Sequence, residues 1–214
     1  MDSRPHGQRR PYRAGRRAEA AAETRAAILD AALRLFLEHG YGKVTVGDIA
    51  RESGTAVPTV YASTGGKASI LAHLISKGIG DPIVDQTLVA VRASHEPREA
   101  VAIATHGVRV DNERYCALLQ ILITAATLDE TAAETLTGAN RVYRKALAIV
   151  AGQLEGMHAL REGLTQGRAT DILWFFLGHQ SWRLYVTDCG WSWNDTEQWL
   201  ADQVSAALLG DSIG

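Results

Sequence analysis

The sequence predicts an all-α fold. Apolar residues recur at helical spacing along most of the chain, and no alternating stretch of strand length bounded by turn residues occurs. Of the 214 residues, 46% are hydrophobic, which is enough to bury a substantial core. We therefore expect a folded helical protein rather than a disordered chain.

The first helix is predicted within residues 21–40. Ile28, Leu35 and Phe36 share one face of it, and Gly40 ends the pattern. Clusters of Gly, Pro, Ser and Asp interrupt the later helical patterns and mark their ends. Further helices are predicted near residues 67–79, 97–109, 113–127, 131–157, 169–187 and 194–209.

Positive charge is concentrated in the N-terminal part of the chain. Residues 1–70 contain eleven Lys and Arg against seven acids, whereas the remaining residues contain eleven against seventeen. The N-terminal part is therefore where a polyanion would bind. Residues 1–18 set arginines among Pro and Gly, which predicts a flexible basic arm that either contacts the polyanion or is simply solvated. The candidate contact residues in it are Arg9, Arg10, Arg13, Arg16 and Arg17.

Two short helices joined at Gly54 are predicted next. Thr45 can accept a hydrogen bond from the first helical turn and so cap the first of them. Gly54 tolerates the left-handed backbone that a sharp turn needs, and Pro58 fits only the first turn of the second helix. The spacing of Ala50, Gly54 and Val60 predicts a helix-turn-helix, a motif whose second helix lies in the DNA major groove.

Residues 24–75 resemble the DNA-binding domain of the TetR family of bacterial transcriptional repressors. One position departs from the family pattern, because this chain has Thr64 where most relatives carry an aromatic residue shortly before a lysine. The motifs that match the pattern are Gly40-Tyr41, Thr45, Ile49-Ala50, Ser53-Gly54, Thr59-Val60-Tyr61 and Lys67.

The resemblance implies a helix-turn-helix domain at residues 19–66 that binds a double-stranded DNA operator. Thr45, Tyr61 and Lys67 are expected to contact phosphates, which position a protein without reading the base sequence. Methyl groups on the second helix favour apolar contacts with thymine. The residues expected to face the bases are Ala56, Val57, Pro58 and Thr59, although Val57 is equally suited to the core.

Residues 67–214 are expected to form a larger helical domain for ligand binding and dimerisation. One helix-turn-helix buries little surface, so two copies on a palindromic operator are expected. Family members pair their final helices, and the last predicted helix carries an apolar stripe. The expected contacts of this homodimer are Trp199, Val204 and Leu208.

The resemblance also implies that a small-molecule effector binds within residues 80–190 and releases the repressor from DNA. The expected site is an apolar pocket with a few polar groups. Aromatic and aliphatic side chains without clustered charge favour an uncharged or weakly polar effector that is apolar or aromatic. The candidate ligand-binding residues, any of which could instead be core, are Tyr115, Gln120, Trp174, Phe175, His179, Trp182 and Tyr185.

Other classes of function are less favoured. The seven His show no metal-ligand spacing and no nucleophile or phosphate-loop motif occurs, so we expect no metal, no cofactor and no enzymatic activity. The alternative is an all-α adaptor that binds a protein partner without DNA, with an enzyme less favoured still. No membrane span or signal peptide is recognisable and two Cys are too few for a disulfide framework, so a cytoplasmic protein is expected.

Overall fold

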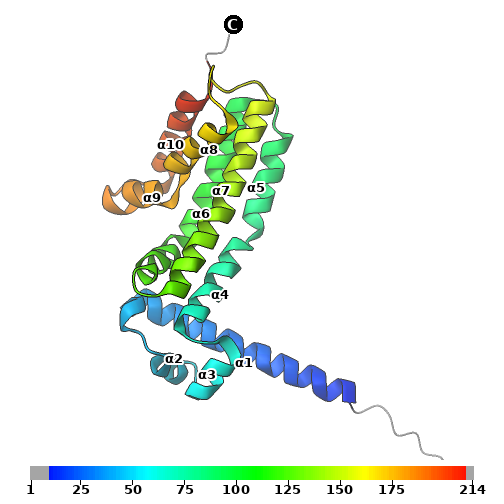
Figure 1. Ribbon diagram of the computed structural model, residues 1–214, viewed down its shortest axis with the longest axis vertical. Helices are drawn as coiled ribbons and strands as arrows, with labels where there is room; N and C mark the ends of the chain where they lie inside the picture. The colour runs from blue at the N-terminus through cyan, green and yellow to red at the C-terminus, as the bar shows by residue number, and fades with distance from the viewer. Residues whose placement is uncertain (1–9, 211–214) are drawn as a thin grey trace, which may run out of the picture. The chain divides into compact units, whose positions relative to one another are not determined.

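The computed structural model describes residues 10–210, with side chains from residue 15 onward (Figure 1). The all-α prediction is confirmed, since these residues contain no strand and only an isolated bridge between Leu160 and Leu209. The elements are α1 (Arg10–His39), the 3-10 turn η1 (Tyr41–Lys43), α2 (Val46–Glu52), α3 (Val57–Thr64), α4 (Lys67–Ile79), α5 (Pro82–Ala93), α6 (Pro97–Ala126), α7 (Glu130–Gly156), α8 (Gln166–Leu177), α9 (His179–Trp182), the π-helical η2 (Arg183–Asp188) and α10 (Trp193–Leu208).

The helices form two compact units. The first unit contains the residues up to Leu74 together with Ile121–Ala133, and the second contains Ile75–Gln120 together with the residues from Glu134 onward. The boundaries therefore fall inside α4, α6 and α7, and not at residue 67, where the sequence pattern predicted the larger domain to begin. One long helix can contribute one segment to each of two cores. A prediction that places domain boundaries only between helices does not anticipate this.

The first helix begins earlier than the sequence predicted. Residues 10–18 continue α1 and are not the irregular arm that their Pro and Gly content suggested. Ala and Arg are strong helix formers, and Pro11 lies in the first turn, where its missing N–H leaves no helical bond unmade. Residues 1–9, which include Arg9, lie outside the described residues.

The sequence pattern also missed α5. Residues 80 and 81 separate α4, which ends at Ile79, from α5, which starts at Pro82. Asp81 caps it by accepting a hydrogen bond from the Ile83 N–H at 3.0 Å, and Pro82 occupies the first turn. An Asp-Pro pair followed by apolar residues was therefore a start signal that the sequence contained.

Two further predicted boundaries are wrong. The two helices predicted between residues 97 and 127 form one continuous α6, because Asn112 in its middle is buried and donates to Val108 O at 2.9 Å. Conversely, the helix predicted at residues 169–187 is interrupted at Gly178, whose backbone is extended with ψ at 147°. The chain beyond that glycine therefore follows a new direction.

The core of the first unit lies where α1, α2 and α3 pack against one another. Ile28, Phe36, Ile49 and Val60 are at most 1% exposed. The last turn of α3 buries Thr64, whose hydroxyl donates to Val60 O at 2.9 Å. The departure from the family pattern at this position therefore leaves no unpaired hydroxyl in the core.

Part of the core of the second unit lies where α8 and α10 pack together. Trp182, Val204 and Leu208 are fully buried in this core, and Trp182 stacks on Trp193 with ring centroids 5.9 Å apart. Val204 and Leu208 are therefore not surface contacts of a dimer, which corrects the prediction, because their face of α10 is covered within the chain. Trp199 remains 40% exposed.

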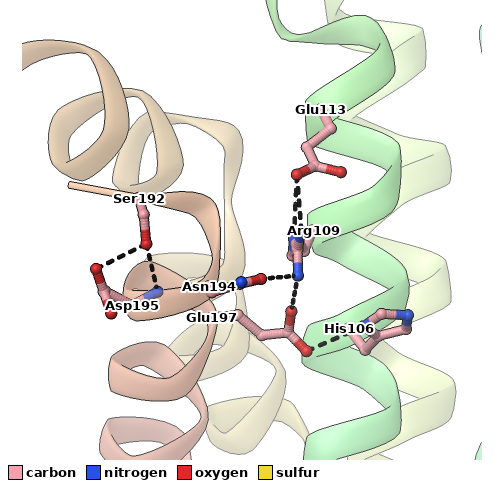
Figure 2. A network of polar contacts seen from close by, with 7 residues as sticks. All are labelled: His106, Arg109, Glu113, Ser192, Asn194, Asp195 and Glu197. Carbon is pink, nitrogen blue, oxygen red and sulfur yellow. Dashed lines mark hydrogen bonds and ion pairs between the residues drawn. The ribbon is translucent and has the colours of Figure 1, made fainter. Parts of the chain in front are cut away.

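A polar network fixes the first turn of α10 against α6 (Figure 2). Arg109 donates to Asn194 Oδ1 at 2.5 Å and to Glu197 Oε2 at 2.9 Å, and its guanidinium also bonds Glu113 on its own helix at 3.0 Å. His106 lies 3.0 Å from the other carboxylate oxygen of Glu197. The hydrogen bond to Glu197 contributes most to raising the pKa of Arg109. The network thus fixes the orientation of α6. The faces of α6 that do not bear this network can then pack inside the second unit.

Substitution of two nearby glycines by Ala should change the free energy of unfolding in opposite directions. Gly54 has φ at +66°, where a side chain costs about 1–2 kcal/mol, so Gly54→Ala should destabilise the protein. Gly47 lies inside α2, its new Cβ would meet only Thr45 Oγ1 at 3.5 Å, and Ala is favoured over Gly in a helix by about 1 kcal/mol. Urea unfolding followed by circular dichroism measures both changes. Shifts of the same sign would contradict the left-handed turn at Gly54.

Candidate functional site

The helix-turn-helix begins with a complete capping box at α2. The Thr45 hydroxyl accepts a hydrogen bond from Asp48 N at 3.1 Å, and the Asp48 carboxylate accepts one from Thr45 N at 3.0 Å. Hydrogen bonds from Thr45, first from its hydroxyl and then from its backbone, lower the pKa of Asp48. Thr45 is exposed at the N-terminal end of α2, where backbone N–H groups can meet an anion.

The turn between the two short helices is closed by backbone bonds. Thr55 N donates to Ala50 O at 2.9 Å across Gly54. The following helix, α3, starts at Val57, and Ala56 precedes it without a side-chain cap. The first N–H groups of α3 therefore lack the side-chain acceptor that most helices have at this end.

One face of α3 is buried and the others are exposed. Val60 is fully buried, whereas Val57 and Tyr61 are 40% and 54% exposed. Val57 therefore lies outside the core, which was one of the two positions expected for it. The residues predicted to face the bases, all of them exposed, are Ala56, Val57, Pro58 and Thr59.

Lys67 does not project a free ammonium group. Its Nζ donates to Tyr41 O at 2.8 Å and to Val44 O at 3.0 Å, and it lies 4.0 Å from the centroid of the Tyr41 ring. Burial lowers the pKa of Lys67, although the negative charge of Asp129 opposes this shift. Lys67 therefore holds the segment between α1 and α2 with two of its three N–H groups, and its contact with a DNA phosphate stays a prediction.

The basic residues of the predicted arm belong to α1 from residue 10 onward. Arg16 and Arg17 are exposed on that helix. Arg10 and Arg13 lie in its first turns, but their side chains, like all of Arg9, fall outside the described set. A helix, and not an irregular segment, therefore carries most of this positive charge.

The second unit contains a cavity of about 150 Å³. Helices α4 to α9 all contribute side chains to it, and most of these side chains are aliphatic. Tyr115, Trp174 and His179, which are three of the seven predicted ligand-binding residues, line the cavity. The rings of Trp174 and His179 meet edge to face, with centroids 6.4 Å apart.

The other four predicted ligand-binding residues lie elsewhere. Phe175 is 72% exposed, and Gln120 is exposed on α6 outside the cavity lining. Trp182 is fully buried in the core, and Tyr185 does not line the cavity either. The physical reason for the last two is the interruption at Gly178, because residues beyond it do not continue the helix face on which they were predicted.

The sequence analysis missed Asp111, the only acidic side chain among the described residues that line this cavity. Burial raises the pKa of Asp111 to about 6; the negative charge of Asp81 adds to the shift, and Arg114 opposes it. A signal was present in the sequence, because Val108, Asp111 and Tyr115 follow the i, i+3, i+7 spacing of one helix face. An acidic residue on this otherwise apolar helix face indicated a candidate site residue.

Comparison with known proteins identifies the helix-turn-helix. Residues 28–74 match the family described as bacterial regulatory proteins, tetR family. The match identifies this part of the chain as a helix-turn-helix domain of the tetR family.

Similar proteins include both a curated sequence and solved structures. The HTH-type transcriptional regulator BetI of Agrobacterium fabrum is 37% identical over 82 residues, which cover 38% of this chain and only 39% of that curated relative. The repressor NalD of Pseudomonas aeruginosa, which controls the MexAB-OprM multidrug efflux pump, superposes with a TM-score of 0.71 at 22% identity, over 90% of this chain and 99% of that one. SmeT in complex with triclosan gives 0.70 at 21% identity, over 90% and 94%. At these identities the structural likeness shows the fold alone.

Among the described residues, no group of three or more His, Cys, Asp or Glu is placed to hold a metal ion. None of the helices that these residues form is long and apolar enough to cross a membrane. Cys116 and Cys189 are both free.

Replacing Lys67 by Met should destabilise the protein by about 1–3 kcal/mol, because two carbonyl oxygens lose a charged donor while the apolar stem is kept. Lys43→Met removes an exposed lysine nearby and should change the free energy of unfolding by less than about 0.5 kcal/mol. Urea unfolding of both variants measures the difference. Unchanged stability of Lys67→Met with a loss of DNA affinity would instead support Lys67 as a phosphate contact.

Proposed function

We propose that this protein is a cytoplasmic TetR-family repressor that binds a palindromic operator as a homodimer and is released by a small-molecule effector. The observation that carries the proposal is the exposed surface of α3. Val60 anchors this helix in the core, while Ala56, Val57, Pro58 and Thr59 leave methyl groups and one hydroxyl exposed. Such a surface suits apolar contacts with thymine methyl groups in the major groove.

Phosphate contacts surround this reading surface in the proposal. Thr45 stands at the N-terminal end of α2, and the exposed Tyr61 carries a hydroxyl on α3. Exposed arginines on α1 add positive charge, which supplies affinity that does not depend on base sequence. The proposed phosphate contacts are Thr45, Tyr61, Arg9, Arg10, Arg13, Arg16 and Arg17.

A homodimer would supply the second reading head. One helix-turn-helix contacts a single half-site, and two-fold symmetric proteins match palindromic operators. The last elements of the second unit expose large apolar side chains, of which Phe175, Leu184 and Trp199 are 72%, 48% and 40% exposed. Exposed apolar groups of this kind support pairing with a second copy.

The cavity in the second unit is the proposed effector site. Its aliphatic and aromatic lining favours an effector with an apolar or aromatic body. A volume of about 150 Å³ suits a compound of roughly one ring, since an engineered cavity of this size binds benzene. SmeT, which shares the fold, forms a complex with triclosan. Release requires that the effector bind the conformation of low operator affinity more tightly than the other.

Neutralising two arginines of α1 should flatten the salt dependence of operator binding. The operator is first found by selection from random oligonucleotides, and affinity is then measured by fluorescence anisotropy over a range of salt concentrations. Each phosphate contact contributes about 0.9 to the slope of log affinity against log salt. Arg16→Gln with Arg17→Gln removes four such contacts from a homodimer and should therefore reduce the slope by about 4. Arg92→Gln with Arg98→Gln, exposed in the second unit, is the matched control.

The same preparation tests the dimer, because sedimentation of the operator complex should give two copies of the chain per site. An unchanged salt slope in the Arg16 and Arg17 variant would show that this part of α1 does not touch phosphates. A one-to-one complex on a single half-site would overturn the homodimer.

Filling the cavity should uncouple operator binding from the effector. Compounds that change tryptophan emission, to which Trp174 in the cavity lining contributes, are screened for loss of operator affinity. Ala146→Leu adds three carbon atoms to the cavity lining and should keep operator affinity while weakening the response to such a compound at least tenfold. Ala102→Leu, exposed on α6, is the control. If compounds that occupy the cavity leave operator affinity unchanged, effector control is wrong.

A further inference from the structure

Asp111 is a carboxylate without a partner in the cavity. No residue in the described part of the chain forms a hydrogen bond with it, although it lines a space bounded mainly by aliphatic and aromatic side chains. The positive charge that acts on Asp111 is that of Arg114, whose Nη1 donates to both oxygens of Asp81, at 3.2 and 3.0 Å. Asp81 is also bonded by the Tyr115 hydroxyl at 2.7 Å. The acid in the cavity therefore has no cation of its own.

The two Tyr side chains in the cavity lining can contact a ligand with their rings but not with their hydroxyls, because both hydroxyls already form hydrogen bonds within the chain. The Tyr115 hydroxyl is taken by Asp81, and the Tyr143 hydroxyl donates to Leu177 O at 2.8 Å. The Tyr143 ring meets Trp174 edge to face, with centroids 5.5 Å apart. The electron-rich faces of such rings attract cations.

The cavity lining contains no Lys or Arg among the described residues. Its one basic side chain, His179, has a pKa lowered by burial and by the positive charge of Arg183, so it is neutral at pH 7. The buried Nε2 of His179 also has no hydrogen-bond partner within the described chain. The site thus combines one uncompensated negative charge, aromatic rings and an unused polar atom.

We propose that this cavity binds a small organic monocation, whose charge is neutralised by Asp111 and whose body packs against Tyr143 and Trp174. An isolated carboxylate in an apolar space is costly, and it becomes favourable when a ligand supplies the opposite charge. The volume of about 150 Å³ limits the ligand to roughly the size of one ring. The inference rests on the proposed effector site and specifies its ligand class, which differs from the uncharged effector that the sequence favoured.

The raised pKa of Asp111, about 6, supports a dependence of this binding on pH. The charged and titratable groups near Asp111 are Asp81, whose charge favours the neutral acid, and Arg114, whose charge opposes it; His179 also lines the cavity. A cation prefers the ionised carboxylate and therefore releases a proton when it binds below this pKa. Its affinity should fall about tenfold from about pH 7.5 to about pH 5, because ionised Asp111 falls to about a tenth of the population.

Titration calorimetry on the full chain tests the proposal with matched pairs of compounds. Choline and 3,3-dimethylbutan-1-ol have nearly the same shape but differ in charge, and benzylamine and benzyl alcohol form a second pair with an N–H donor on the cation. At least one cation should bind about 10- to 100-fold more tightly than its neutral partner, the gain expected for a charge-assisted contact. Preference for choline or for benzylamine distinguishes a quaternary from a protonated ammonium.

Asp111→Asn keeps the shape of the side chain and should abolish both the preference for the cation and the pH dependence. Asp85→Asn, which removes an exposed acid from α5, is the control and should change neither. Thermal unfolding verifies that both variants are folded. Equal binding of cation and neutral partner, equal cation affinity of Asp111→Asn and the parent chain, or failure of both cations to bind at millimolar concentration overturns the proposal.

The outcome is separable from that of the proposed function, because calorimetry needs no DNA. A cation that binds through Asp111 without changing operator affinity would leave this inference standing and remove effector control. An effector that releases the operator but binds equally well to Asp111→Asn would do the reverse.

Discussion

The DNA-reading surface depends on the apolar face of α1. With seven and eight residues, α2 and α3 are too short to be stable as isolated helices, so they exist because Ile49 and Val60 are buried in a shared core with α1. A helix held by so few buried side chains leaves its other faces free. This is why Tyr61, the neighbour of the fully buried Val60, is largely exposed. The packing that stabilises α3 and the exposure that would let it read bases are two consequences of one constraint.

A partly buried cation completes this arrangement. The carbonyl groups of Tyr41 and Val44 belong to the short segment between α1 and α2, and Lys67 from the start of α4 donates to both. Because Val44 directly precedes Thr45, these bonds help to fix the point at which the capping box begins. An ammonium group with two of its three N–H bonds used in this way is a structural element.

The polar groups that line the cavity of the second unit fall into two sets: those that have a hydrogen-bond partner in the chain and those that do not. Asn112, Tyr115 and Tyr143 lie in its lining, and each donates a hydrogen bond to another group of the chain. Asp111 and the Nε2 of His179 do not have such partners. Buried polar groups are nearly always paired in folded proteins. Two other unpaired atoms of the described residues, Trp182 Nε1 and Thr196 Oγ1, lie outside the cavity lining, so within the lining Asp111 and His179 are groups left to bind a ligand.

The sequence by itself determined what depends on neighbours along the chain. Helical periodicity defined the all-α class, and the cap at Thr45 and the turn at Gly54 could be predicted because their bonds join residues within a few positions. Tertiary structure alone decided which polar or aromatic residue serves which role. Lys67 donates to carbonyl groups 23 and 26 positions away, and Val204 is buried in the core that α8 and α10 form within the chain. Asp111 has no hydrogen-bonded cation, because Arg114 is bonded to Asp81, 33 positions distant. The physical reason is that burial and charge pairing depend on distances in space, which the pattern of one helix does not encode.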